Sequence, residues 1–352
     1  MKKILGLILG VSVLTGCNAH QAMAPKVEVS KPVPVTKFSE YAGALEELGE
    51  MMYAYEEAPF VVMVEPIVDN TASGGKIPSD VTMLTESAIQ NIGESVLLMP
   101  YNDNSVAIAQ SQGKAIYAVH GAITEFDAGT TTKSSGTQLG FSLNKLDLDA
   151  GAESGSGFQS GTIAVDFLLL DMNSGAYVPG VKATAKAKLE KNEANQGFNF
   201  SILGNGFGLN GNSTAKSPVH HVINLMLEYS MAQLIGQAKT YPYWLAMKGT
   251  DPDYRVMRQM KRKFERSEER SQNVWVTYLL NRIDPSVPSA QAKLSAYTKQ
   301  RISAAKEQFG IIPPDGSVNS EIYMKLLTDG VSLKRSNQTV NKADNLLQSA
   351  FK

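Results

Sequence analysis

Two long stretches rich in glycine, serine, threonine and asparagine most strongly limit how this chain can fold. They span residues 128–161 and 190–217, and each holds few of the large apolar side chains that build a soluble core. Both are longer than the structureless loops that are common in compact domains. They must therefore either lie on the surface as loops or form strands of an unusual kind.

Parts of both stretches alternate between apolar and polar residues, which is typical of outer-membrane β-hairpins. The apolar positions of this pattern are Phe141, Leu143, Leu146 and Leu148 in the first stretch, and Phe198, Phe200, Ile202, Phe207 and Leu209 in the second. We predict that these residues lie on membrane strands with one face toward lipid; surface loops are the alternative. Two hairpins supply too few strands to close a barrel, so a pore would require a ring of subunits.

The N-terminus has the pattern of a bacterial lipoprotein signal. Lys2 and Lys3 precede an apolar stretch over residues 4–14, and the sequence Leu-Thr-Gly-Cys then ends at Cys17. This order supplies a branched apolar residue, two small residues and a thiol that takes diacylglycerol before cleavage. We predict a signal peptide over residues 1–16 and a covalent lipid on Cys17. An ordinary signal peptide that happens to end in cysteine is the alternative.

Cys17 is the only cysteine among 352 residues, so no intrachain disulfide can form. Several acyl chains on one residue give firm membrane anchoring, and Asn18, where an aspartate would favour inner-membrane retention, favours the outer membrane. The formal net charge of −1 argues against a nucleic-acid partner, which would need a strongly basic face. No later stretch reaches the apolar length of a transmembrane helix.

Apolar periodicity and turn residues predict an α+β fold with helices on a mixed sheet. A tether with three prolines leads into a helix within residues 38–55, so residues 17–58 form an N-terminal segment. Strands are predicted at 60–68, 96–100, 115–123, 162–171 and 181–189, and helices at 81–92 and 219–236. From residue 249 the chain is dense in both charges and has helical spacing, so we interpret 59–248 as one domain and 249–352 as a helical region.

Four features in this order resemble the curli secretion channel (CsgG-like) family of outer-membrane lipoproteins. The lipid-attachment sequence comes first, and residues 60–71, which end in Asp69-Asn70-Thr71, are similar to the family's first strand and its Asp-x-Thr turn. Residues 119–126 match its Val-x-Gly-x-Ile-x-x-aromatic strand. Residues 162–175 are similar to a further strand and its Asp-x-x-Ser/Thr-Gly turn.

The resemblance covers residues 60–236 and implies a ring-shaped homo-oligomer. The two glycine-rich stretches would be extended β-hairpins that contribute to a shared transmembrane β-barrel above a periplasmic vestibule. The implied function is an outer-membrane pore or secretion channel for a surface fibre, adhesin or polymer, with secreted subunits or appendage proteins as partners. The alternative is a non-conducting ring that anchors a surface appendage and is attached to peptidoglycan.

In the family, the loop after the Asp-x-Thr turn narrows the pore. The resemblance places Gly74, Gly75, Lys76, Ile77 and Pro78 in this loop. The loop is shorter here and has no aromatic side chain, so it departs from the constriction of the family.

Residues 295–330 are similar to half of a helical peptidoglycan-binding module, because a helix end near Gln308 and an Asp315-Gly316 turn precede a second helix. A helical pair used only in packing is the alternative. No catalytic motif stands out, and the adjacent His220 and His221 would point in different directions on a helix. We therefore predict no enzyme, no metal site and no cofactor beyond the lipid on Cys17.

Replacing Cys17 with serine tests the lipid anchor. Because serine cannot take diacylglycerol as the thiol does, the variant should lose palmitate labelling and appear as an uncleaved or soluble form. Radiolabelling and membrane fractionation measure this, and normal outer-membrane fractionation of the variant would contradict the lipoprotein prediction.

Overall fold

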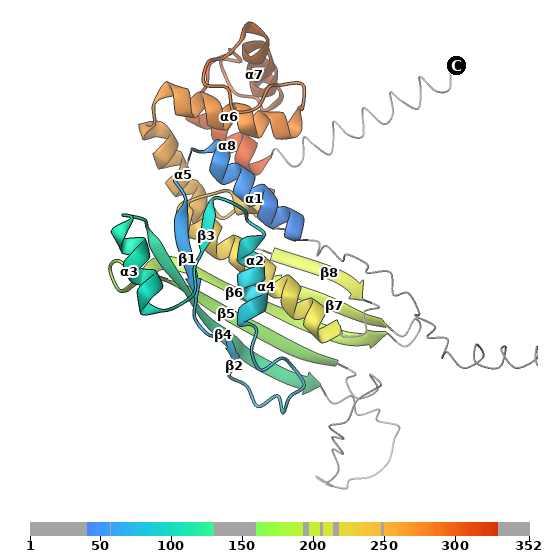
Figure 1. The fold of residues 1–352 in the computed structure, drawn as a ribbon. Coiled ribbons are helices and arrows are strands. Elements are labelled where there is room, and N and C mark those ends of the chain that lie inside the picture. Colours follow the sequence, from blue (N-terminus) through green and yellow to red (C-terminus); the bar gives the residue numbers. More distant parts are fainter. Residues whose placement is uncertain are drawn as a thin grey trace, which may run out of the picture. The chain divides into compact units, whose positions relative to one another are not determined.

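An eight-stranded mixed sheet with helices packed on it forms the centre of the structure, a computed structural model (Figure 1). It describes residues 41–56, 58–129, 160–192, 197–204, 207–213, 218–247 and 250–329. The strand order is β3-β1-β4-β5-β6-β7-β8, and β2 lies beside β4. The predicted α+β class is confirmed.

The strands are β1 (Phe60–Val64), β2 (Val68–Asp69), β3 (Val96–Leu98), β4 (Ile116–Gly129), β5 (Ser160–Asp171), β6 (Ala176–Asn192), β7 (Gly197–Gly204) and β8 (Phe207–Ser213). The helices are α1 (Ala42–Ala54), α2 (Thr82–Gln90), α3 (Asp103–Ser111), α4 (Pro218–Lys239), α5 (Tyr254–Arg266), α6 (Glu269–Ile283), α7 (Ala296–Gln308) and α8 (Ser320–Thr328), with a 3₁₀ turn, η1, at Tyr243–Leu245. Strands β1, β2 and β3 make parallel pairs, and β4 to β8 are antiparallel.

Two of the differences from the sequence prediction concern which elements form. The predicted strand 60–68 divides into β1 and β2 because Pro66 has no N–H to donate to the ladder. Helix α3 was not predicted, since its exposed Ile108 hides the apolar pattern. Asn102 begins this helix by accepting a 2.9 Å hydrogen bond from the Ser105 N–H, and Ala109 packs in a small cluster with Met63.

One face of the sheet is dry because apolar and polar residues alternate along β5 and β6. Along β6 the inward side chains are small, with Ala183, Ala185 and Ala187 fully buried. Small side chains allow a helix to lie close to the sheet, and α4 packs over this row. Helix α4 is buried almost all round, which is expected of a helix that is covered by other elements on its remaining sides.

The helical region after residue 249 shares an aromatic core with α1. Tyr55, just after α1, stacks on Trp275 of α6 at 5.1 Å between ring centroids. Its hydroxyl also lies 3.1 Å from that of Tyr323 in α8, and burial raises the pKa of both phenols, so both are neutral. Phe264 of α5 stacks on Tyr323 at 4.3 Å. The helical region is therefore fixed to the α1 layer by side-chain packing.

Replacing Phe264 with alanine should lower the free energy of unfolding by about 3–5 kcal/mol, because a buried ring is lost and a cavity remains. Phe264 is 1% exposed, whereas Tyr254 in the same helix is 71% exposed. The control Tyr254→Ala should change the stability by no more than about 0.5 kcal/mol. Chemical denaturation followed by tryptophan fluorescence measures both, and equal effects would contradict the shared core.

Candidate functional site at one end of the sheet

The two glycine-rich stretches start side by side at one end of the sheet. Gly129, the last residue of β4, lies opposite Ser160, the first of β5, and Ser160 in turn lies opposite Glu190 of β6. Asn192 and Gly197 then pair at the β6–β7 connection. The stretches are separate in sequence, but the sheet brings their first residues together at what we call the hairpin end.

The loop predicted to narrow the pore, residues 74–78, lies toward the same end, and we call it the neck loop. Strand β2 pairs with Ala122 and Ile123 at the middle of β4, and the loop follows directly. Two backbone hydrogen bonds close its base: the Asp69 N–H donates to Ser79 O at 3.0 Å, and the Val81 N–H donates to Ile67 O at 2.9 Å. The loop is therefore a closed projection from the sheet edge beside β4.

The Asp-x-Thr turn holds the start of this loop through its carboxylate. Asp69 Oδ1 accepts hydrogen bonds from the backbone N–H and the hydroxyl of Thr71, at 2.8 and 2.5 Å, and Oδ2 accepts one from the Ser73 hydroxyl at 2.6 Å. Partial burial acts to raise the pKa of Asp69. The hydrogen bonds from Ser73 and Thr71 outweigh this effect and hold the pKa below its ordinary value.

The neck-loop residues divide by exposure. Gly74 and Gly75 are exposed and have positive φ angles of 62° and 83°, which favour glycine. Ile77 is only 4% exposed and packs in the main core, so its side chain anchors the loop instead of facing an opening. Lys76 and Pro78 are partly exposed. Lys76 is thus the charged side chain of the predicted set that reaches solution.

The predicted strand residues of the second stretch form an antiparallel hairpin, β7–β8, that lies beside β6. Phe198, Phe200 and Ile202 are buried, and the Phe200 ring meets the His221 ring of α4 edge-on at 6.1 Å. Leu209 of β8 is partly buried against the same core, and Phe207 begins β8. In the single chain this apolar face is therefore covered by α4.

Other predicted positions lie outside the described residues. These are the lipid-attachment residue Cys17 and the first-stretch residues Phe141, Leu143, Leu146 and Leu148.

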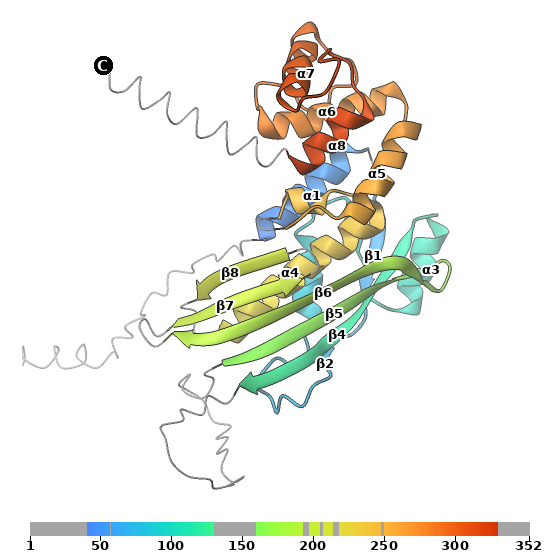
Figure 2. The same cartoon turned by 180° about the vertical axis from the view of Figure 1, so that it is seen from behind.

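Away from α3, none of the described helices covers the sheet face opposite α4, and this face carries many polar side chains (Figure 2). Asp166 lies at its centre and accepts hydrogen bonds from the hydroxyls of Thr124 and Thr184, at 2.5 and 2.6 Å. Lys186 pairs with Glu125 at 2.7 Å. Sequence reasoning missed this network because its members come from three strands, and only the alternation along each strand signals it.

His120 lies half exposed on this face, and its Nδ1 is 2.7 Å from Glu65 Oε2. Among the described residues no group of three or more potential metal ligands comes together. His220 and His221 lie in the first turn of α4, where His221 packs on Phe200. This part of the chain therefore offers a histidine that is hydrogen-bonded to a carboxylate.

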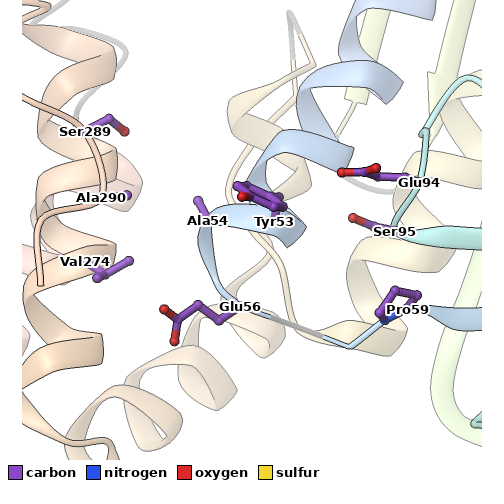
Figure 3. Close-up of a pocket in the computed structure, with 9 residues that line it drawn as sticks. All are labelled: Tyr53, Ala54, Glu56, Pro59, Glu94, Ser95, Val274, Ser289 and Ala290. Atoms are coloured by element: carbon purple, nitrogen blue, oxygen red, sulfur yellow. The ribbon is translucent and has the colours of Figure 1, made fainter.

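A groove of about 690 Å³ lies away from the hairpin end, between the end of α1 and α6 (Figure 3). Its carboxylates, Glu56 and Glu94, come from different walls, and Glu56 is paired with Arg270 at 3.3 Å. Tyr53 and Val274 make much of the remaining lining. Polar groups do not converge on a single point here, so we assign the groove no chemistry.

The C-terminal Asp-Gly turn is held by a buried lysine. Lys306 of α7 is fully buried, and its Nζ lies 2.5 Å from Asp315 Oδ1 and 3.1 Å from the Ser317 hydroxyl. Hydrogen bonds from Lys306 and Ser317 lower the pKa of Asp315 to about 2. This contact fixes the turn that joins α7 to α8, which is the part similar to a peptidoglycan-binding module.

No protein-family model and no curated protein matches the chain. The resemblance to the secretion-channel family therefore depends on the quoted residues and stays a prediction. None of the described helices has the length and apolar character needed to cross a membrane.

Replacing Asp69 with asparagine should change how stability depends on pH. The folded-state pKa of Asp69 is lowered, so its contribution is present above the unfolded pKa of about 4 and is lost as the pH falls through the lower folded value. The wild type should lose more stability between about pH 5 and pH 2 than Asp69→Asn. Denaturation curves across this range measure the difference, and parallel curves would contradict the assignment.

Proposed function

We propose that this chain is a lipid-anchored subunit of an oligomeric ring that forms an outer-membrane pore for a surface fibre, adhesin or polymer. The lipid on Cys17 would hold each subunit at the inner leaflet of the outer membrane. The sheet and helices would lie in the periplasm, and the stretch between β4 and β5 would cross the bilayer as a hairpin.

The observation that supports this proposal is the convergence at the hairpin end. Gly129, Ser160 and Glu190 lie on adjacent strands, so both glycine-rich stretches start from neighbouring positions of one antiparallel ribbon. A membrane strand needs about 9–11 residues. The 30 positions between β4 and β5 are enough for two such strands and a turn.

The open polar face supports the same arrangement. In a ring with strands along the axis, one sheet face points inward and the other outward. Helix α4 covers one face, and the uncovered face carries Asp166, Lys186 and Glu125, whose charges and hydrogen bonds suit water. We place this face toward the lumen of the ring.

A second candidate is a non-conducting ring that anchors a surface appendage and is tied to peptidoglycan. The burial of Phe200 and Ile202 under α4 favours it, because these side chains then have no need of lipid. Imaging of detergent-extracted particles tests both candidates together, since each requires a ring. Conductance across a planar bilayer separates them, because only the pore would pass current.

The neck loop gives the sharper test of a pore. Lys76→Glu reverses a charge beside the hairpin end, so it should shift the reversal potential of a conducting ring toward cation selectivity. Lys114→Glu makes the same change just before β4, at its opposite end. That control should leave selectivity close to wild type, because a wide vestibule screens charge within about 10 Å at 0.1 M salt. Equal shifts in both variants would contradict the neck assignment.

A further inference from the structure

The direction of the strands limits how copies of this chain can join. Strands β4, β6 and β8 run toward the hairpin end, and β5 and β7 run away from it. Rotation about a ring axis keeps the direction of every strand relative to that axis. If β8 of one copy met β4 of the next, each junction would be parallel. If β7 met that β4 instead, each junction would be antiparallel.

An antiparallel junction between subunits matches the pairing within each subunit better than a parallel one, because every neighbouring pair of strands from β4 to β8 is antiparallel. A symmetric ring continues this alternation of strand direction only with an even number of strands per subunit. The ribbon from β4 to β8 has an odd number, whereas the ribbon from β4 to β7 has an even one. Parallel pairing is also slightly less stable per residue.

We propose that the outer edge of β7 is the surface through which copies of this chain associate, and that β8 covers this edge until the β4 strand of a second copy displaces it. This inference rests on the proposed ring. To the proposed ring it adds the strand edge through which the subunits join, that of β7, and the strand that must move before they can join, β8.

The composition of β8 suits a strand that can leave. Its sequence is Phe-Gly-Leu-Asn-Gly-Asn-Ser, and glycine and asparagine are both depleted in stable strands. It packs mainly on β7, whereas β7 also packs on α4. Leu209 is its side chain in contact with the main core. Within residues 208–211, whose side chains the structure describes, departure of β8 would remove one apolar side chain, Leu209, from the core, and it would uncover the Phe200 ring that lies against Gly211.

Strand β7, by contrast, is held in place. Phe200 and Ile202 are buried beneath α4, so removal of β7 would expose both side chains to water. Opposite Phe200, β8 carries Gly211, where a Cβ atom would lie 2.5 Å from Phe200 Cζ. The two strands therefore meet here through a ring and a bare backbone, with no side chain at the β8 position opposite Phe200.

The place of the incoming strand follows from the other side of the sheet. Among the described residues, β2 pairs with β4 only at Ala122 and Ile123, and no further described strand continues along that side. The sheet therefore becomes narrower toward Gly129. The second half of β4 lies at the same end as the last residue of β8, Ser213, and runs in the same direction, so it can take the position that β8 leaves.

Two disulfide staples that share one residue test the proposal. Ser201 of β7 lies directly opposite Asn210 of β8 on one side and Lys188 of β6 on the other. The test variant is Ser201→Cys with Asn210→Cys, and the matched control is Ser201→Cys with Lys188→Cys. Cys17 is the only native cysteine, which limits competing bridges. Ring yield is measured by light scattering and particle imaging of full-length, detergent-extracted protein, oxidised and reduced.

Oxidation should lower the ring yield of the β7–β8 staple at least about tenfold, and reduction should restore it, because the bridge prevents β8 from leaving. The oxidised β6–β7 staple should assemble within about twofold of wild type, since that pair stays together. Similar helical and sheet content by circular dichroism, with and without each bridge, would show that both variants fold.

Other results would overturn the proposal in different ways. Rings that form equally well from the oxidised β7–β8 staple would show that β8 stays, while the ring itself stands. Failure of the oxidised β6–β7 staple alone would show that β7 and β8 move together as a hairpin. Absence of rings from the wild-type chain would refute the proposed function, and the role of β7 with it.

Discussion

The close packing of α4 on β6 is the interaction on which the rest of the structure depends. Ala183, Ala185 and Ala187 offer no side-chain bulk, so a long apolar helix can lie directly on the sheet. The helix then becomes a surface on which α1, α2 and η1 pack. Larger residues in the alanine row would push α4 outward and separate these layers. Close packing is what gives a core of this kind its stability.

This packing leaves one face of the sheet buried under α4 and the opposite face exposed to solvent. Polar contacts are therefore made on the exposed face. Under α4, apolar side chains such as Phe200 and Ile202 lose contact with water. On the opposite face, Asp166 and Lys186 meet partners from neighbouring strands. Exposed ion pairs of this type add little stability. In the proposed ring, this face would suit contact with a hydrated lumen better than contact with another protein core.

The covered β7–β8 hairpin links the single chain to its proposed assembly. A strand at the edge of a sheet presents backbone groups that can pair with another copy, and proteins commonly protect such edges. Here β8 gives that protection with residues of weak strand preference, over a β7 that α4 holds firmly. The lipid anchor predicted at Cys17 would add a high local concentration of copies on one membrane surface. In the proposed ring, both features would favour assembly at the membrane over association in solution.

The sequence by itself determined the α+β class, most element positions, the lipid-attachment pattern and the alternation of apolar residues in both glycine-rich stretches. Period-two alternation shows which residues share a face, since successive strand residues point to opposite sides. It does not show what covers that face, because lipid and a helix are equally apolar. Only the tertiary structure put α4 over Phe200 and Ile202, buried Ile77 of the neck loop, and brought Gly129, Ser160 and Glu190 together. These contacts join residues that are far apart in the chain. Local sequence patterns describe only neighbouring residues, so they do not predict such long-range contacts.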